Sequence, residues 1–254
     1  MAAAPRDASS RSAPLPTSYA DTSRRPLPSL VLLFPLLVFH ELGVIFGGAH
    51  QADTVVAYRK IEQGIDTFGT VFVAAPAVLT VVLLLGLHLV RRDPWTIRPH
   101  VPPFMALEAV IWAVALFAVQ IWLEGVLLAA PSAGTGGTAW IDRLTLAFGA
   151  GLYEELVFRL LLVGGGCWAI ARIFPRKTRL AAIGSVLASA ILFAFYHDLG
   201  AAAPGEQGRL LVVYLIGGVF FGTIYLLRGF GIVAAAHAGY DVLVIALGGG
   251  ASGV

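Results

Sequence analysis

Seven long apolar runs, separated by short breaks rich in proline, glycine or charge, dominate this chain of 254 residues. A run of ~20 mainly apolar residues crosses a bilayer as an α-helix, because a helix satisfies its backbone polar groups internally. Hydrophobic residues make up 58% of the sequence and charged residues only 13%, well below the share that is usual in soluble domains. We therefore expect an all-α, polytopic transmembrane helix bundle of about seven spans, within a range of six to eight. The expected spans are residues 28–47, 68–90, 104–130, 144–163, 180–199, 209–227 and 230–248.

The first 27 residues have a different composition from the rest of the chain. They are rich in alanine, proline, serine and arginine, which is typical of a disordered tail and not of a signal peptide. We expect a single transmembrane domain over residues 28–254. The net charge of +2 is too small to favour a nucleic-acid partner.

Lysines and arginines are distributed unequally between the two sides that this topology defines. If the N-terminus is inside, the inside segments contain most of them, including those within residues 6–25, 91–98 and 172–179. The positive-inside rule therefore predicts a cytoplasmic N-terminus and a C-terminus on the opposite side. We expect an integral membrane protein of the plasma (inner) membrane, with the lipid bilayer as its surroundings.

Three ionisable residues, Glu154, Glu155 and Arg159, lie within the expected span 144–163. Each costs ~2.5–3.5 kcal/mol at the centre of a membrane helix, and an apolar residue returns only ~0.3–0.6 kcal/mol. The helix must therefore direct a polar stripe towards protein or water, and such residues are functional candidates. Glu155 and Arg159 are spaced i, i+4 and can pair, whereas Glu154 lies ~100° around the helix and points elsewhere.

Two later spans carry candidate partners at the same helical spacing. Phe193 and His197 share one face of the fifth expected span, and His237 and Asp241 share one face of the seventh. Together the three spans supply carboxylates, imidazoles and a guanidinium inside the membrane.

These patterns resemble the family of CAAX prenyl proteases and bacteriocin-processing (Abi-type, type II CAAX endopeptidase) intramembrane proteases. EELVFR (154–159) matches EExxxR, FAFYH (193–197) matches FxxxH, and HAGYD (237–241) matches HxxxN/D. Each pattern alone is weak, but three in this order on successive hydrophobic spans are specific. The resemblance covers about residues 140–248, which we expect to form the CAAX-protease-like core.

The resemblance implies an intramembrane endopeptidase that hydrolyses a peptide bond of a membrane-associated protein or peptide, whether prenylated or not. Carried over residue by residue, Glu154 would be the general base that activates water, and His197 would help to hold that water. His237 would stabilise the oxyanion, while Glu155 and Arg159 would support the site by pairing. Amide hydrolysis needs such a base together with donors aimed at the developing charge.

Residue 241 is an aspartate, where many members of the family carry an asparagine. An ionised carboxylate accepts hydrogen bonds and cannot donate one to an oxyanion. We therefore expect Asp241 to orient His237 and to keep it protonated. Phe193 completes the FxxxH pattern as a supporting residue.

No cofactor is expected, but zinc is an alternative on the same fold. Two histidines and a glutamate are a legitimate catalytic zinc set, here Glu154, His197 and His237, although no two of them share a helix. In the first span, the dipeptide His40–Glu41 does not continue into HExxH, because Val44 replaces the second histidine. A third interpretation is a non-catalytic membrane protein, either a bacteriocin-immunity factor or a scaffold.

The seven-span topology leaves one geometric difficulty. Straight, upright helices would place Glu154, His197 and His237 about 10–15 Å apart in depth. Helix tilt, a helical break or one long helix over residues 139–174 must close that gap.

Overall fold

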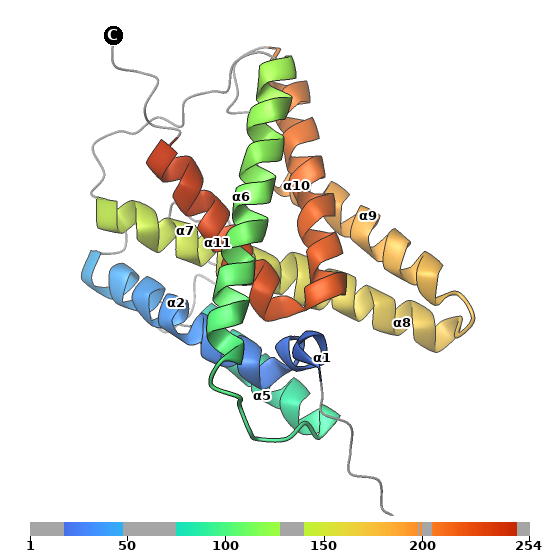
Figure 1. Cartoon of the computed structure of the whole chain (residues 1–254). Coiled ribbons are helices and arrows are strands. Elements are labelled where there is room, and N and C mark those ends of the chain that lie inside the picture. The colour runs from blue at the N-terminus through green and yellow to red at the C-terminus, as the bar shows by residue number, and fades with distance from the viewer. Residues whose placement is uncertain (1–17, 48–74, 128–139, 198, 200–204, 248–254) are drawn as a thin grey trace, which may run out of the picture.

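The computed structural model describes residues 18–47, 75–127, 140–197, 199 and 205–247. The expected span segments 68–74 and 128–130 and residue 248 lie outside the described residues. Within these ranges every regular element is a helix, as Figure 1 shows. The helices are α1 (Tyr19–Ser23), α2 (Pro26–Gly47), α5 (Ala75–Arg91), α6 (Val101–Leu127), α7 (Trp140–Glu155), η2 (Leu156–Gly164), α8 (Gly165–Ile173), α9 (Thr178–Tyr196), α10 (Gln207–Arg228) and α11 (Phe230–Leu247).

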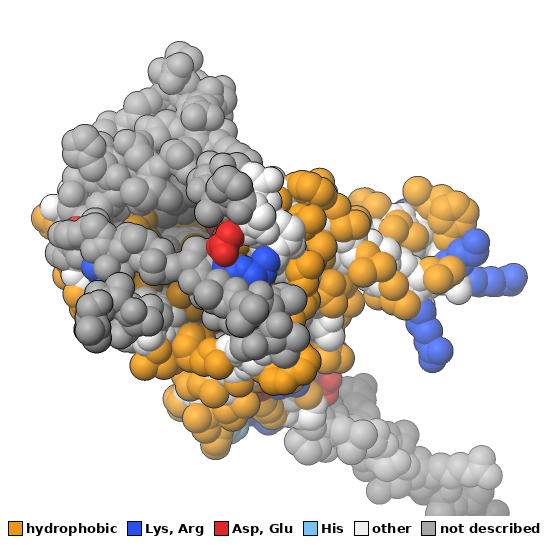
Figure 2. All heavy atoms as spheres, turned by 90° about the horizontal axis from the view of Figure 1, so that it is seen from above, with side chains coloured by type: hydrophobic (Ala, Val, Ile, Leu, Met, Phe, Trp, Pro, Cys, Tyr) orange, Lys and Arg blue, Asp and Glu red, His pale blue; other side chains and the backbone are white. Residues whose placement is uncertain are grey.

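The helical part of the chain has the length and composition of a polytopic membrane protein. Among the described residues, six helices are long and apolar enough to cross a membrane, and Ala77–Arg91 is a shorter apolar helix. Large apolar side chains such as Phe34, Ile111 and Phe195 are exposed, as expected for lipid-facing positions. Figure 2 shows largely hydrophobic flanks, with basic side chains gathered at the tip formed by α8 and α9. The expected bundle of about seven spans is confirmed.

The fourth span is longer than the expected 144–163. It runs without interruption over 34 residues, Trp140–Ile173, and consists of α7, η2 and α8. The segment η2 is a nine-residue π-helix that starts directly after Glu155. Ser189 of α9 donates a hydrogen bond from Oγ to the carbonyl oxygen of Phe158 (2.7 Å) within this segment. Short π-helical segments occur frequently at functional sites, and this one carries Arg159.

Helix α11 occupies a central position because it packs mainly against α6 and α7 and also contacts α2 and α10. Small residues bring the backbones together. A Cβ atom on Gly151 would lie 2.4 Å from the backbone nitrogen of Ala238, so α7 and α11 approach closely only because residue 151 is glycine. In the same way, Gly218 of α10 packs directly on Ala190 of α9.

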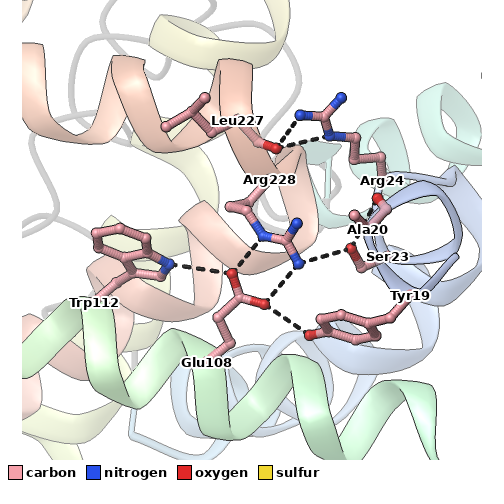
Figure 3. A network of polar contacts seen from close by, with 8 residues as sticks. All are labelled: Tyr19, Ala20, Ser23, Arg24, Glu108, Trp112, Leu227 and Arg228. Carbon is pink, nitrogen blue, oxygen red and sulfur yellow. Dashed lines mark hydrogen bonds and ion pairs between the residues drawn. The ribbon is translucent and has the colours of Figure 1, made fainter.

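The N-terminal segment is more ordered than its composition predicts. Residues 18–27, which we expected to belong to a disordered tail, form α1 and the start of α2, while residues 1–17 lie outside the described residues. Tertiary contacts hold α1, because the Tyr19 hydroxyl donates a hydrogen bond to Glu108 (2.8 Å), which also pairs with Arg228 (Figure 3). Burial, reinforced by the Glu108 carboxylate, raises the pKa of Tyr19 to about 12, so the hydroxyl stays protonated and donating.

Candidate active site

Glu155, the last residue of α7, lies at the centre of a buried charge cluster. Its Oε1 atom lies 2.9 Å from Nη1 of Arg159 and 2.8 Å from Nδ1 of His237. Glu155 and Arg159 are fully buried, and His237 is 5% exposed. The structure contains the expected i, i+4 pair and adds His237 from α11 to it. One carboxylate oxygen therefore joins three helical segments.

Aromatic rings surround the guanidinium group of Arg159. Its Cζ atom lies 4.4 Å from the ring centroid of Phe193 and 5.4 Å from that of Phe221. Its Nη2 atom donates a hydrogen bond to the carbonyl oxygen of Gly218 (3.4 Å). Ring faces attract a cation and offset part of the cost of removing it from water. Phe193 thus contacts Arg159 as well as sharing a helix face with His197.

Glu154 points away from this cluster, as the helical spacing predicts. Its Oε2 atom lies 3.8 Å from Nε2 of His197, and Glu154 is 5% exposed. His197 follows the last residue of α9, and its Nδ1 atom lies 2.8 Å from the carbonyl oxygen of Phe193. Because a carbonyl oxygen only accepts, Nδ1 carries a hydrogen atom and Nε2 faces Glu154. The two residues form an acid–imidazole pair separated by more than hydrogen-bond distance.

The two nitrogens of His237 face different carboxylates. Nδ1 contacts Glu155, while Nε2 lies 3.7 Å from Oδ2 of Asp241. The ring of Phe221 stacks on the imidazole, with centroids 4.5 Å apart and planes 22° apart. We expected Asp241 to orient His237, but the close hydrogen bond to the imidazole belongs to Glu155. Asp241 lies within ion-pairing distance only, because its i, i+4 position places it beside the opposite nitrogen.

The depth difference expected between Glu154, His197 and His237 is absent from the structure. The long fourth span brings Glu154 beside His197, because α9 packs against η2, and it brings Glu155 beside His237, because α11 packs against α7. A single continuous helix thus presents adjacent glutamates to two different helices.

The geometry supports a zinc site at Glu154, His197 and His237 less well than it supports a metal-free pair of Glu154 and His197. The described residues contain no group of three or more histidine, cysteine, aspartate or glutamate side chains placed to hold a metal ion. The dipeptide of the first span belongs to the interface between α2 and α7: Nδ1 of His40 lies 2.7 Å from the carbonyl oxygen of Thr145, and Glu41 accepts a 2.5 Å hydrogen bond from the Tyr153 hydroxyl.

Helix α10 contributes residues to the site that the motifs did not reveal. Tyr214 stacks on His197 with ring centroids 3.9 Å apart and planes 17° apart, and Phe221 stacks on His237. With Gly218 between them, these residues follow the spacing i, i+4, i+7 along one helix face. That periodicity was the available signal, although aromatic residues at such spacing are common in any packed helix.

Residues 136–243 match the family model described as Rce1-like, type II CAAX prenyl endopeptidase. The matched range contains all the residues of the charge cluster, the pair Glu154 and His197, and the aromatic face of α10. The resemblance inferred from the three motifs is thereby confirmed over these residues. The long apolar helices indicate an integral membrane protein. No curated protein and no solved structure matches the chain significantly.

Proposed function

We propose that this chain is an intramembrane endopeptidase that hydrolyses a peptide bond of a membrane-associated protein or peptide. The observation that carries the proposal is the placement of Glu154 and His197, 3.8 Å apart between Oε2 and Nε2 in a largely buried position. This separation suits two groups that hold one water molecule jointly. The charge cluster of Glu155, Arg159 and His237 lies next to this pair, because Glu155 directly follows Glu154 in α7.

In the first step, Glu154 acts as the general base. It takes a proton from the water that it holds with His197, and the resulting hydroxide attacks the carbonyl carbon of the scissile bond. Stacking on Tyr214 and the hydrogen bond from Nδ1 to the Phe193 carbonyl fix the plane of the His197 ring. The attack yields a tetrahedral intermediate with a negative charge on the former carbonyl oxygen.

His237 supplies the donor for that oxygen. Glu155 holds Nδ1, so the N–H group at Nε2 is the one available to the oxyanion. We propose that Asp241, 3.7 Å from Nε2, favours the protonated imidazole electrostatically and does not itself donate. When the intermediate collapses, Glu154 returns its proton to the leaving amine and the C–N bond breaks.

We propose that the reaction needs no metal ion. Nδ1 of His237 is engaged by Glu155, and the described residues offer no converging set of three ligands. Activity that survives exhaustive chelation would agree with this proposal, whereas activity lost on chelation and restored by zinc would favour the metal-dependent alternative.

We also propose that the N-terminus faces the cytoplasm and that the protein resides in the plasma (inner) membrane. The support is the positive-inside rule, applied to the basic residues at the ends of α5 and α8 and before α2 and α9. Cysteine-accessibility labelling of the α8–α9 turn, in intact against permeabilised cells, tests the orientation.

The substitution Glu154→Gln tests the peptidase function. It keeps the shape of the side chain and removes the base, so we expect turnover to fall at least 100-fold. The assay uses protein in nanodiscs and a panel of quenched fluorescent peptides with and without a prenylated cysteine. Glu206→Gln is the matched control, because among the described residues Glu206 forms its one ion pair with Arg209 at the start of α10. Equal cleavage by Glu154→Gln and the native protein would eliminate the hydrolytic mechanism.

A further inference from the structure

A cavity of about 260 Å³ lies at the end of the bundle where α2 and α11 begin and where α5 and α10 end. None of the glutamates and histidines of the candidate active site lines it. Its wall combines two arginines, two hydroxyl groups and apolar surface: Arg24, Arg91, Ser29, Tyr225, Leu160 and Phe230. Such a mixture is suited to a ligand with an anionic end and an apolar end.

The two arginines of this cavity differ from their neighbours in how their charge is compensated. Arg25 lies 3.8 Å from Asp93, and Arg228 pairs with a carboxylate of α6. Within the described part of the chain, neither Arg24 nor Arg91 forms an ion pair. The cavity therefore has positive charge that no ion pair with a described carboxylate neutralises.

Arg24 is held in place before any ligand arrives. Its Nε atom donates a 2.7 Å hydrogen bond to the carbonyl oxygen at the end of α10. Figure 3 shows that the preceding helix α1 is anchored to Glu108, which accepts from Tyr19 and pairs with Arg228, and that Trp112 donates to the same carboxylate (3.3 Å). A cationic group with a fixed position loses less conformational entropy when it binds an anion.

The charged side of the cavity lies where apolar helices begin and end, which is the level expected for the lipid headgroups. Arg91 ends the apolar helix Ala77–Arg91, and Arg24 precedes Pro26, where the first span begins. From this level Leu84 and Leu160 continue the wall towards the middle of the membrane. The charged end and the apolar end of the cavity thus follow the polarity of a phospholipid.

We propose that this cavity binds an anionic phospholipid, with its phosphate at Arg24 and Arg91 and the first part of an acyl chain against Leu84 and Leu160. Guanidinium groups recognise phosphate through paired N–H donors. The proposal goes beyond the peptidase function and does not depend on it.

The test measures binding of phosphatidylglycerol to the full chain in non-ionic detergent micelles by native mass spectrometry, with zwitterionic phosphatidylcholine, which has no net charge, as the comparison. A basic residue at an anionic lipid surface contributes about fivefold in affinity. Arg91→Gln should therefore weaken phosphatidylglycerol binding about fivefold, and Arg24→Gln with Arg91→Gln about 25-fold. The matched control is Arg172→Gln with Arg176→Gln, which removes the same charge from exposed positions at the α8–α9 tip and should leave binding unchanged.

Three results would overturn the proposal: equal weakening in the control pair, equal binding of phosphatidylcholine, or displacement of the lipid by millimolar inorganic phosphate, which would make the cavity a site for free phosphate. Arg24→Gln removes a hydrogen bond and can disturb folding. Arg91→Gln alone keeps the test decisive, because Arg91 has no ion pair or hydrogen bond to lose among the described residues.

Discussion

Arg159 and His237 share the carboxylate of Glu155, so substitutions here should affect the stability of the fold and the peptidase activity differently. Glu155→Gln keeps the side-chain volume but removes the charge that compensates Arg159, which is fully buried. Breaking a buried ion pair by removing one partner costs about 3–5 kcal/mol, because an uncompensated charge stays behind. We expect the free energy of unfolding to fall by about that amount, measured by denaturant titration in mixed micelles.

A second substitution in the same background sharpens the test. Arg159→Met replaces the guanidinium with an apolar side chain among the rings of Phe193 and Phe221. Replacing both members of a buried pair is often neutral, so the double variant Glu155→Gln, Arg159→Met should regain most of the lost stability. Peptidase activity should stay low, because the carboxylate that holds Nδ1 of His237 is still missing.

Two outcomes would refute this reasoning. One is a loss of less than about 1 kcal/mol in Glu155→Gln, which is typical of an exposed pair. The other is a double variant no more stable than the single one. Glu206→Gln serves as the reference for a partly exposed pair and should cost at most about 1 kcal/mol.

Substitutions at three further contacts give three more predictions. Tyr214→Phe keeps the ring that stacks on the imidazole of His197 and should retain activity, whereas Tyr214→Ala should lower kcat/KM about threefold to tenfold, the equivalent of an aromatic pair. Asp241→Asn should lower turnover without loss of the folded state seen by size-exclusion chromatography; full activity would remove any role for that carboxylate. Gly151→Val should prevent α7 from packing on α11 and abolish the folded yield. Gly86→Ala should be tolerated, because an added Cβ would meet no described atom within 4 Å outside its own helix backbone.

The number of spans could be predicted from the sequence, but the limits of the fourth span could not. Apolar runs report length directly, because a membrane helix must be about as long as the bilayer is thick. Gly164 and Gly166 resemble a break, yet the helix continues through them. Neighbouring side chains occupy the space at these glycines, since a Cβ atom would lie 2.4 Å from the hydroxyl of Tyr225 and 2.6 Å from the hydroxyl of Ser185, respectively. Only the packed structure distinguishes a contact glycine from a breaking glycine.

The structure brings the candidate residues of the three motifs close together, but their pairing could be predicted from the sequence only within single helices. The spacing i, i+4 correctly pairs Glu155 with Arg159. It also suggested Asp241 as the residue that orients His237, although Glu155 makes the closer contact from another helix. Contacts between helices depend on how each helix is rotated about its axis, and one sequence does not specify that rotation. The sequence also did not predict that α1 is ordered, because the residues that hold α1 in place lie on other helices, Glu108 on α6 and Arg228 on α10.

The π-helical segment makes the fourth span sensitive to chain length. Before this segment, Glu154 faces α9 and Glu155 faces α11. At its end, Gly164 contacts α10, and Gly166 just beyond it contacts α9. Each residue added or removed between these two groups turns one relative to the other by the rotation of one residue, which is ~100° in an α-helix. A one-residue deletion in this segment would therefore separate the acidic residues from their partners or move the glycines away from theirs. A substitution changes one side chain of this helix and leaves the direction of the others unchanged. An insertion or a deletion turns all the side chains on one side of it at once.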